Sequence, residues 1–83
     1  MDFSNRNILI TGAADGLGFA LSKAFSEKKA NLFLLDIDHK KLIKNNIFNA
    51  KNIECDLSKI DSLEKIFLNL SKEKKSIDIL IHN

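Results

Sequence analysis

Short apolar runs and longer amphipathic segments alternate along the 83-residue chain. The apolar runs are too brief for helices and are continuously apolar, so they predict strands. These predicted strands cover residues 7–11, 31–36, 52–55 and 77–81. The segments between them predict helices over residues 16–28, 38–44 and from residue 58 onward.

The first predicted helix carries apolar residues at positions i, i+3, i+4, i+7 and i+8. This spacing predicts that five residues share one buried face: Leu17, Ala20, Leu21, Ala24 and Phe25. Four polar residues are expected on the opposite side: Ser22, Lys23, Glu27 and Lys28.

Local signals mark the ends of the other two helices. Asp38 is a suitable N-cap for the second helix, and Asn45-Asn46 suits its end. In the third, Ser58 and Asp61 have the spacing of a capping box, with a hydroxyl at the N-cap and an acid three residues later. Four residues are predicted to form the apolar face of the third helix: Ile60, Leu63, Phe67 and Leu70.

The element order predicted in this way is βαβαβαβ. Alternating strands and helices imply an α/β fold with a parallel sheet and right-handed crossovers. In the last strand, the twofold alternation predicts Ile77, Ile79 and Ile81 on one face of the sheet and Leu80 on the other. The chain holds no proline and no linker-like or repeated segment, so residues 1–83 are interpreted as one unit.

Composition excludes some classes of function. The net charge is +2, and the densest basic run, residues 72–75, includes Glu73, which favours a solvated helix end over a nucleic-acid surface. The single cysteine, Cys55, cannot form an internal disulfide and fits a reducing compartment. The first residues lack a signal-peptide pattern, and no run approaches the ~20 apolar residues of a membrane span. We therefore expect a soluble, cytoplasmic protein without nucleic-acid or membrane partners.

Three glycines, Gly12, Gly16 and Gly18, follow the first strand and open the first helix. Glycine reaches positive φ without steric cost and lets backbone N–H groups approach a pyrophosphate. The helix N-terminus adds unpaired N–H groups and roughly half a positive charge. The order strand, glycine turn, helix thus predicts a phosphate-binding site. The alternative is a tight turn that only packs the helix against the strand.

Asp36 ends the second predicted strand, 18 residues after Gly18. A carboxylate there can accept hydrogen bonds from the ribose hydroxyls of an adenosine, although a loop acid or helix cap is the alternative. A 2′-phosphate would be repelled by Asp36 and by Asp15 in the turn. Lys40 and Lys41, which follow Asp36, could compensate this charge, but they are expected on the helix surface. The sequence therefore predicts NAD(H) in preference to NADP(H).

Other polar residues carry weaker signals. His39 and His82 are interpreted as structural, and Cys55 as a small half-buried apolar residue. No group of His, Cys and acidic residues has metal-ligand spacing, so no metal is expected. Phe19 rather than a lysine follows Gly18, which excludes an ordinary P-loop.

The spacing Thr11-Gly12-x-x-x-Gly16-x-Gly18 resembles that of the short-chain dehydrogenase/reductase family. Cys55-Asp56-Leu57-Ser58 is similar to the family's segment after its third strand, where an aspartate, here Asp56, meets the adenine. Asp78-Ile79-Leu80-Ile81-His82-Asn83 is similar to the family's fourth strand and the start of its Asn-Asn-Ala-Gly motif. His82 stands at the first asparagine position, and Asn83 matches the second.

The resemblance implies a Rossmann fold, a doubly wound parallel sheet with strand order 3-2-1-4. It implies an oxidoreductase that transfers hydride between a nicotinamide cofactor and an alcohol or carbonyl carbon. The cofactor-binding residues that it implies are Thr11, Gly12, Asp15, Gly16, Leu17, Gly18, Asp36, Asp56, Leu57 and Asn83.

The resemblance covers about the first third of such a protein, and the family's catalytic Asn, Ser, Tyr and Lys come later. No catalytic residue is therefore assigned to this chain, which we expect to be truncated after its fourth strand and inactive alone. That strand would be an open apolar edge, so we expect marginal stability or self-association.

Two other functions are consistent with the residues. The chain could be a catalytically inactive nucleotide-binding or interaction module. It could also belong to an S-adenosylmethionine-dependent methyltransferase, which likewise has a glycine turn after its first strand and an acid after its second.

Overall fold

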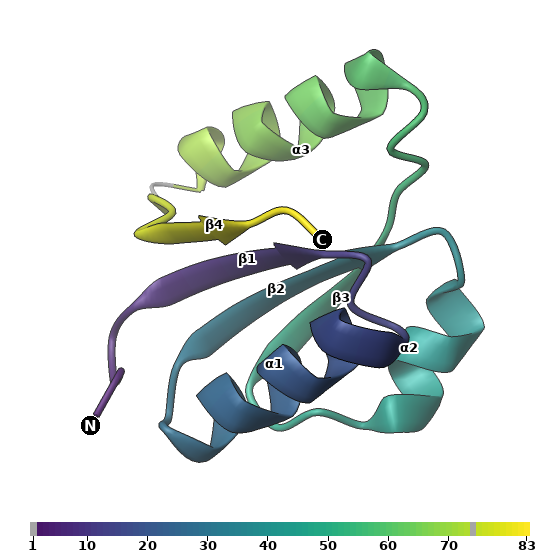
Figure 1. Cartoon of the computed structure of the whole chain (residues 1–83). Helices are drawn as coiled ribbons and strands as arrows, with labels where there is room; N and C mark the ends of the chain where they lie inside the picture. The colour runs from purple at the N-terminus through teal and green to yellow at the C-terminus, as the bar shows by residue number, and fades with distance from the viewer. Residues whose placement is uncertain (1, 74) are drawn as a thin grey trace.

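The computed structural model describes residues 2–73 and 75–83, and of Ile60 the backbone alone. In this part of the chain, four parallel strands form one sheet and three helices connect them (Figure 1). The strands are β1 (Asn7–Thr11), β2 (Asn31–Asp36), β3 (Ala50–Glu54) and β4 (Ile79–Ile81). The helices are α1 (Gly16–Glu27), α2 (His39–Asn45) and α3 (Ile60–Lys72). The sheet order β3-β2-β1-β4 confirms the α/β fold and the predicted topology.

Helices cover both faces of the sheet: α1 and α2 lie on one side, and α3 lies on the other (Figure 1). Because side chains alternate along each strand, β1 and β2 contribute to a core on each side. Ile8, Ile10 and Leu34 are buried toward α1 and α2, whereas Leu9 and Leu35 are buried in the cluster that includes α3 residues. Each such side chain contributes roughly 1.5–3 kcal/mol of burial free energy.

The buried face of α1 differs from the predicted one. Leu21 and Phe25 pack against the core as expected, but Leu17 is 63% exposed, and Ala20 and Ala24 are exposed as well. The side chain at the centre of the contact is Ser22, which is fully buried and donates a hydrogen bond from Oγ to the Gly18 carbonyl oxygen at 2.7 Å. Compared with the predicted face, the buried face of α1 is shifted toward Gly18 and Ser22, because Gly18 lets the helix approach the β1–α1 turn closely.

The predicted start of α2 is confirmed, and that of α3 is wrong. The Asp38 carboxylate accepts a hydrogen bond from the Lys41 backbone N–H, and Asn46 ends α2 in the left-handed region with φ 49°. In α3 the N-cap is Lys59, without a side-chain cap. Ser58 Oγ instead donates to the Asp56 carboxylate, so the predicted capping box does not form.

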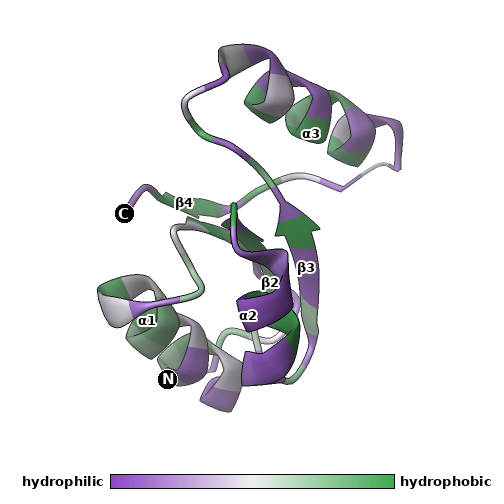
Figure 2. Ribbon diagram, turned by 90° about the vertical axis from the view of Figure 1, so that its right-hand side faces the viewer, coloured by the Kyte–Doolittle hydropathy of each residue, from purple (hydrophilic) through white to green (hydrophobic). Residues whose placement is uncertain are grey.

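The apolar face predicted for α3 largely packs as expected. Leu63, Phe67 and Leu70 contact the cluster around Leu9, while the side chain of Ile60 lies outside the described residues. Hydrophobic and hydrophilic bands alternate along this helix, as expected for one packed face (Figure 2). No helix in the described ranges is long and apolar enough to cross a bilayer.

Strand β4 begins later than predicted. Ile79 and Ile81 pack on the α1 side and Leu80 is 52% exposed, which agrees with the expected alternation. Ile77, however, packs in the α3-side cluster. It precedes the strand, and the Asp78 backbone N–H donates to the Asn7 carbonyl at 2.8 Å, so Ile77 does not follow the strand alternation.

Three asparagines join the amino ends of the strands. Asn31 Nδ2 donates to Asn7 Oδ1 at 3.2 Å, and Asn49 Nδ2 donates to Asn31 Oδ1 at 2.7 Å. Asn7 Nδ2 in turn donates to the Ser76 carbonyl at 2.8 Å. This ladder fixes the edge of the sheet that is opposite to the glycine turn.

Candidate functional site

The turn from β1 to α1 has the backbone conformation that its glycines predict. Gly12 and Gly16 lie at φ +61° and +54°, in the region that favours glycine. A Cβ added at Gly16 would meet no atom within 4 Å. The turn therefore presents a bare backbone to open space at Gly16.

Gly18 is required for a different reason, because the Gly12 carbonyl group leaves no room for a side chain at Gly18. A Cβ there would overlap the carbonyl oxygen of Gly12 and would stand 2.9 Å from Asn83 Nδ2. Gly18 is buried, with α1 packed directly onto the turn. The close packing brings the first turn of α1 to the edge of the sheet.

The N-terminus of α1 has no side-chain partner of its own. Its N-cap, Asp15, makes no capping hydrogen bond, and the first turn contains no acidic residue. The first N–H groups of a helix have no intrahelical acceptor, so this end of α1 is suited to an anion.

The Asp15 carboxylate pairs with the ammonium group of Lys41 in α2. The hydrogen bond to Asp15 raises the pKa of Lys41 above its ordinary value. Lys41 lies on the surface of α2 as expected, and from there it also offsets the charge of Asp15, which the sequence left as the alternative.

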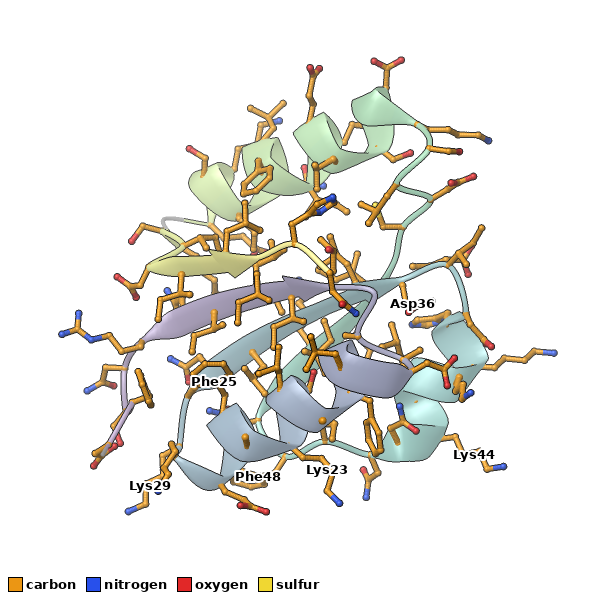
Figure 3. All side chains as sticks on the ribbon, viewed as in Figure 1. Lys23, Phe25, Lys29, Asp36, Lys44 and Phe48 are labelled. Atoms are coloured by element: carbon orange, nitrogen blue, oxygen red, sulfur yellow. The ribbon has the colours of Figure 1, made fainter. Side chains whose placement is uncertain are left out.

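Asp36 joins the end of β2 to the turn and to α2 (Figure 3). Its Oδ2 accepts from the Ala14 backbone N–H at 3.0 Å, and its Oδ1 accepts from the Asp38 N–H at 2.9 Å. A carboxylate oxygen has about two acceptor positions, so each oxygen keeps one for a further donor. The side chain is partly buried, and the turn and the acid are held as one unit.

Asp56 follows β3 and is fixed by its neighbour. Its Oδ1 accepts from Ser58 Oγ at 2.7 Å and from the Ser58 N–H at 3.0 Å, and these bonds lower the pKa of the Asp56 carboxyl. Leu57 is partly buried against the α3-side cluster. The Cys55 N–H donates to the Asp36 carbonyl at 3.1 Å, which ties this segment to the end of β2.

Two residues beyond β4 contact the turn. The Asn83 backbone N–H donates to Thr11 Oγ1 at 3.0 Å, and Asn83 Nδ2 donates to the Gly12 carbonyl at 3.2 Å. His82 Nδ1 lies 3.1 Å from the same Thr11 hydroxyl. Sequence reasoning assigned His82 no partner, although the parallel pairing of Ile10 with Ile81 places it beside Thr11.

The predicted site residues thus collect at the carboxyl edge of the sheet. The turn, Asp36 and Asn83 are joined by direct hydrogen bonds, while Asp56 and Leu57 lie beyond β3, the outermost strand. A cavity of about 500 Å³ lies at the opposite edge, bounded in part by Phe33, Lys51 and the asparagine ladder. The ladder amides bond to one another, so the uncapped turn is the better candidate site. Among the described residues, no group of three or more His, Cys, Asp or Glu could hold a metal ion.

A parallel sheet of order 3-2-1-4, with a glycine turn after its first strand and an acid after its second, defines a Rossmann-type nucleotide-binding fold. Residues 6–83 match the family model described as short chain dehydrogenase. The chain belongs to this family. The assignment gives no support to the methyltransferase alternative.

Curated relatives include dehydrogenases of several substrates. The chain is 32% identical to the NAD-dependent glycerol dehydrogenase of Listeria innocua, over 99% of this chain and 34% of that protein. It is 29% identical to galactitol 2-dehydrogenase of Agrobacterium fabrum, over 100% of this chain and 34% of that protein. The chain therefore spans about a third of the length of these relatives.

Solved structures share the fold. 4-Hydroxyisoleucine dehydrogenase complexed with NADH is 37% identical with a TM-score of 0.82, covering 92% of this chain and 32% of that one. The RhlG/NADP active-site complex of Pseudomonas aeruginosa has a TM-score of 0.86 over 99% of this chain and 35% of that one. At 22% sequence identity, this likeness supports the fold alone. These structures include complexes with NADH and with NADP.

Proposed function

We propose that this chain binds the adenosine diphosphate half of a nicotinamide dinucleotide at the carboxyl edge of its sheet. In the proposed reaction, the whole protein transfers hydride between the nicotinamide and an alcohol or carbonyl carbon. The cofactor supplies the hydride, and the protein binds and orients it. The observation that carries the proposal is the uncapped N-terminus of α1 beside the open backbone of Gly16.

Each part of the edge has a proposed role. The N–H groups around Gly16, Leu17 and Gly18 face the pyrophosphate, because they are close to the positive end of α1. The free acceptor positions of Asp36 receive the ribose hydroxyls. Asp56 meets the adenine, with Leu57 beside it. Thr11, Gly12, Asp15 and Asn83 shape the turn.

We assign no catalytic residue to this chain, which contains no tyrosine to serve as the proton donor that the family resemblance implies. The proposed activity of these 83 residues alone is binding without turnover. We also propose a cytoplasmic location, in keeping with the unpaired Cys55. Association with another strand through β4, whose Leu80 is half exposed, is a further proposal that sedimentation equilibrium would test.

We propose that NAD(H) is preferred to NADP(H). Asp36 presents a carboxylate where a 2′-phosphate would lie, and like charges repel. Lys41 pairs with Asp15, whereas the hydrogen bonds that Asp36 accepts from the described residues come from neutral backbone N–H groups. The preference therefore depends chiefly on Asp36.

Calorimetric titration of the 83-residue chain with NADH and with NADPH tests both proposals. The wild-type chain is expected to bind NADH more tightly, and Asp36→Arg is expected to shift the affinity ratio toward NADPH by about tenfold, equivalent to ~1.4 kcal/mol. Glu64→Arg is the control, since it makes the same charge change at an exposed position of α3, away from the turn. Binding of neither nucleotide would refute the site, and an equal shift in both variants would refute the role of Asp36.

A further inference from the structure

The Thr11 hydroxyl lies between two residues that follow β4. Thr11 is 1% exposed, so its hydroxyl depends on protein partners rather than on water. The Asn83 backbone N–H donates to Oγ1 at 3.0 Å, and the His82 ring nitrogen Nδ1 lies 3.1 Å from the same atom.

This geometry determines the direction of the second hydrogen bond. A threonine hydroxyl has one proton and two lone pairs, and the Asn83 N–H uses one lone pair. If Nδ1 of His82 carried a proton, it would donate to the second lone pair, and the Thr11 proton would point away from both donors, where the described residues supply no acceptor for it. A buried hydroxyl without an acceptor is unfavourable. The Thr11 hydroxyl therefore donates to an unprotonated Nδ1, which leaves the proton of the neutral ring on Nε2.

The same contacts continue into the glycine turn. Asn83 Nδ2 donates to the Gly12 carbonyl oxygen at 3.2 Å, and this oxygen is the atom against which Gly18 packs. The turn conformation is thus linked through Asn83 and Thr11 to the ring of His82.

We propose that His82 is a positioning residue for the nucleotide site. In its neutral Nε2–H form, His82 accepts a hydrogen bond from the Thr11 hydroxyl and so orients the Thr11 lone pair that binds the Asn83 N–H. Asn83 in turn holds Gly12 in the conformation that receives the pyrophosphate. This inference rests on the proposed nucleotide binding, but the tautomer it requires exists without any nucleotide.

The first test measures the tautomer directly. Long-range ¹H–¹⁵N NMR of the 83-residue chain distinguishes a protonated ring nitrogen from an unprotonated one, and His39→Gln assigns the signals, because the chain has two histidines. We expect an unprotonated Nδ1 and a protonated Nε2 at His82 at neutral pH. A protonated Nδ1, or the averaged signals of a free histidine, would overturn the proposal.

The second test uses the position of the acceptor along the side chain. His82→Asn places an oxygen at the δ position occupied by Nδ1, whereas His82→Gln places it at the ε position. We expect His82→Leu and His82→Gln to weaken NADH binding about three- to tenfold, the effect of one hydrogen bond, and His82→Asn to retain it. In a Thr11→Val background, the three substitutions should have no further effect.

The two tests separate this proposal from the proposed function. The expected tautomer without any NADH binding would refute the nucleotide site while leaving the hydrogen bond in place. NADH binding that is equal in all three His82 variants would refute the positioning role while leaving the nucleotide site in place.

Discussion

Gly18 packs so closely against the carbonyl oxygen of Gly12 that a Cβ at Gly18 would overlap it. The contact joins the first turn of α1 to the end of β1. Gly16 differs, since a Cβ there would meet no atom within 4 Å, and glycine is favoured only by the positive φ. The glycines of one motif thus serve two separate physical requirements.

Alanine substitutions are expected to separate these requirements. Gly18→Ala should lower the free energy of unfolding by about 3 kcal/mol, because the clash involves backbone that cannot rotate away. Gly16→Ala should cost only about 1–2 kcal/mol, the penalty for a left-handed conformation. Urea denaturation measures both values. Equal losses in the two variants would show that the Gly12–Gly18 contact is looser than described.

Asp36 is expected to stabilise the fold as well as the site. Asp36→Ala removes the acceptor of the Ala14 N–H, which belongs to a buried residue, and should lower the free energy of unfolding by about 1–3 kcal/mol. Asp36→Asn keeps one acceptor oxygen and should cost less. Urea denaturation of both variants tests the ranking, which would be contradicted by an Asn variant that is as unstable as the Ala variant.

The rotated face of α1 can be tested with one substitution at two positions. Ser22→Leu inserts a large side chain at a fully buried position and should destabilise the protein by about 1–3 kcal/mol. Ala24→Leu, on the exposed side, should change stability by no more than about 0.5 kcal/mol. Thermal unfolding followed by circular dichroism measures the stability of both variants. A larger loss in Ala24→Leu than in Ser22→Leu would support the buried face that periodicity predicts.

Ser58 is expected to control the ionisation of Asp56. Its hydroxyl and N–H lower the pKa of this carboxyl, so Ser58→Ala should raise the pKa toward the ordinary value by removing the hydroxyl contribution. A lowered pKa in the folded state contributes stability above the unfolded pKa and loses it as pH falls through the folded pKa. Carboxyl ¹³C NMR titration measures the shift. An unchanged pKa of Asp56 in Ser58→Ala would contradict the role of the hydroxyl.

Cys55 is expected to react slowly despite being a free thiol. It is 3% exposed, and burial, with a smaller effect from the Asp56 charge, raises the pKa of the thiol and so reduces the thiolate that reacts. An opening free energy of only about 1.4 kcal/mol would slow the reaction tenfold. The rate of labelling by a disulfide reagent at neutral pH, with and without urea, tests this, and Cys55→Ser provides the blank. Labelling as fast as in urea would contradict the described burial.

Much of the fold could be predicted because it depends on local pattern. The runs 7–11 and 31–36 form strands with the predicted bounds, since short, continuously apolar segments are typical of strands that are buried on both faces of a parallel sheet. Ser22 was placed on the wrong face because hydrophobic periodicity does not register the close approach that Gly18 allows. Ser58 was assigned as a cap because spacing alone does not show that Asp56 competes for its hydroxyl.

The contacts that complete the site are the ones that sequence reasoning could not find. Asp15 pairs with Lys41, which is 26 residues away, and Asp36 holds the Ala14 N–H across 22 residues. These pairs depend on how α2 returns along the sheet, which no local signal contains. The positions of Asp36 and the glycines could be predicted, but not the hydrogen bonds that hold them.

The hydrogen bonds from His82 and Asn83 to the turn also order the events of folding. Thr11 and His82 are 71 residues apart, so their contact closes a loop that contains all three helices and strands β2, β3 and β4. Closing so long a loop costs conformational entropy before the contact returns any stability, and contacts of this kind tend to form late. During synthesis the glycine turn emerges before β4, yet it can gain the hydrogen bonds from His82 and Asn83 only after β4 has left the ribosome and paired with β1. The turn is therefore made before β4 but completed only after it.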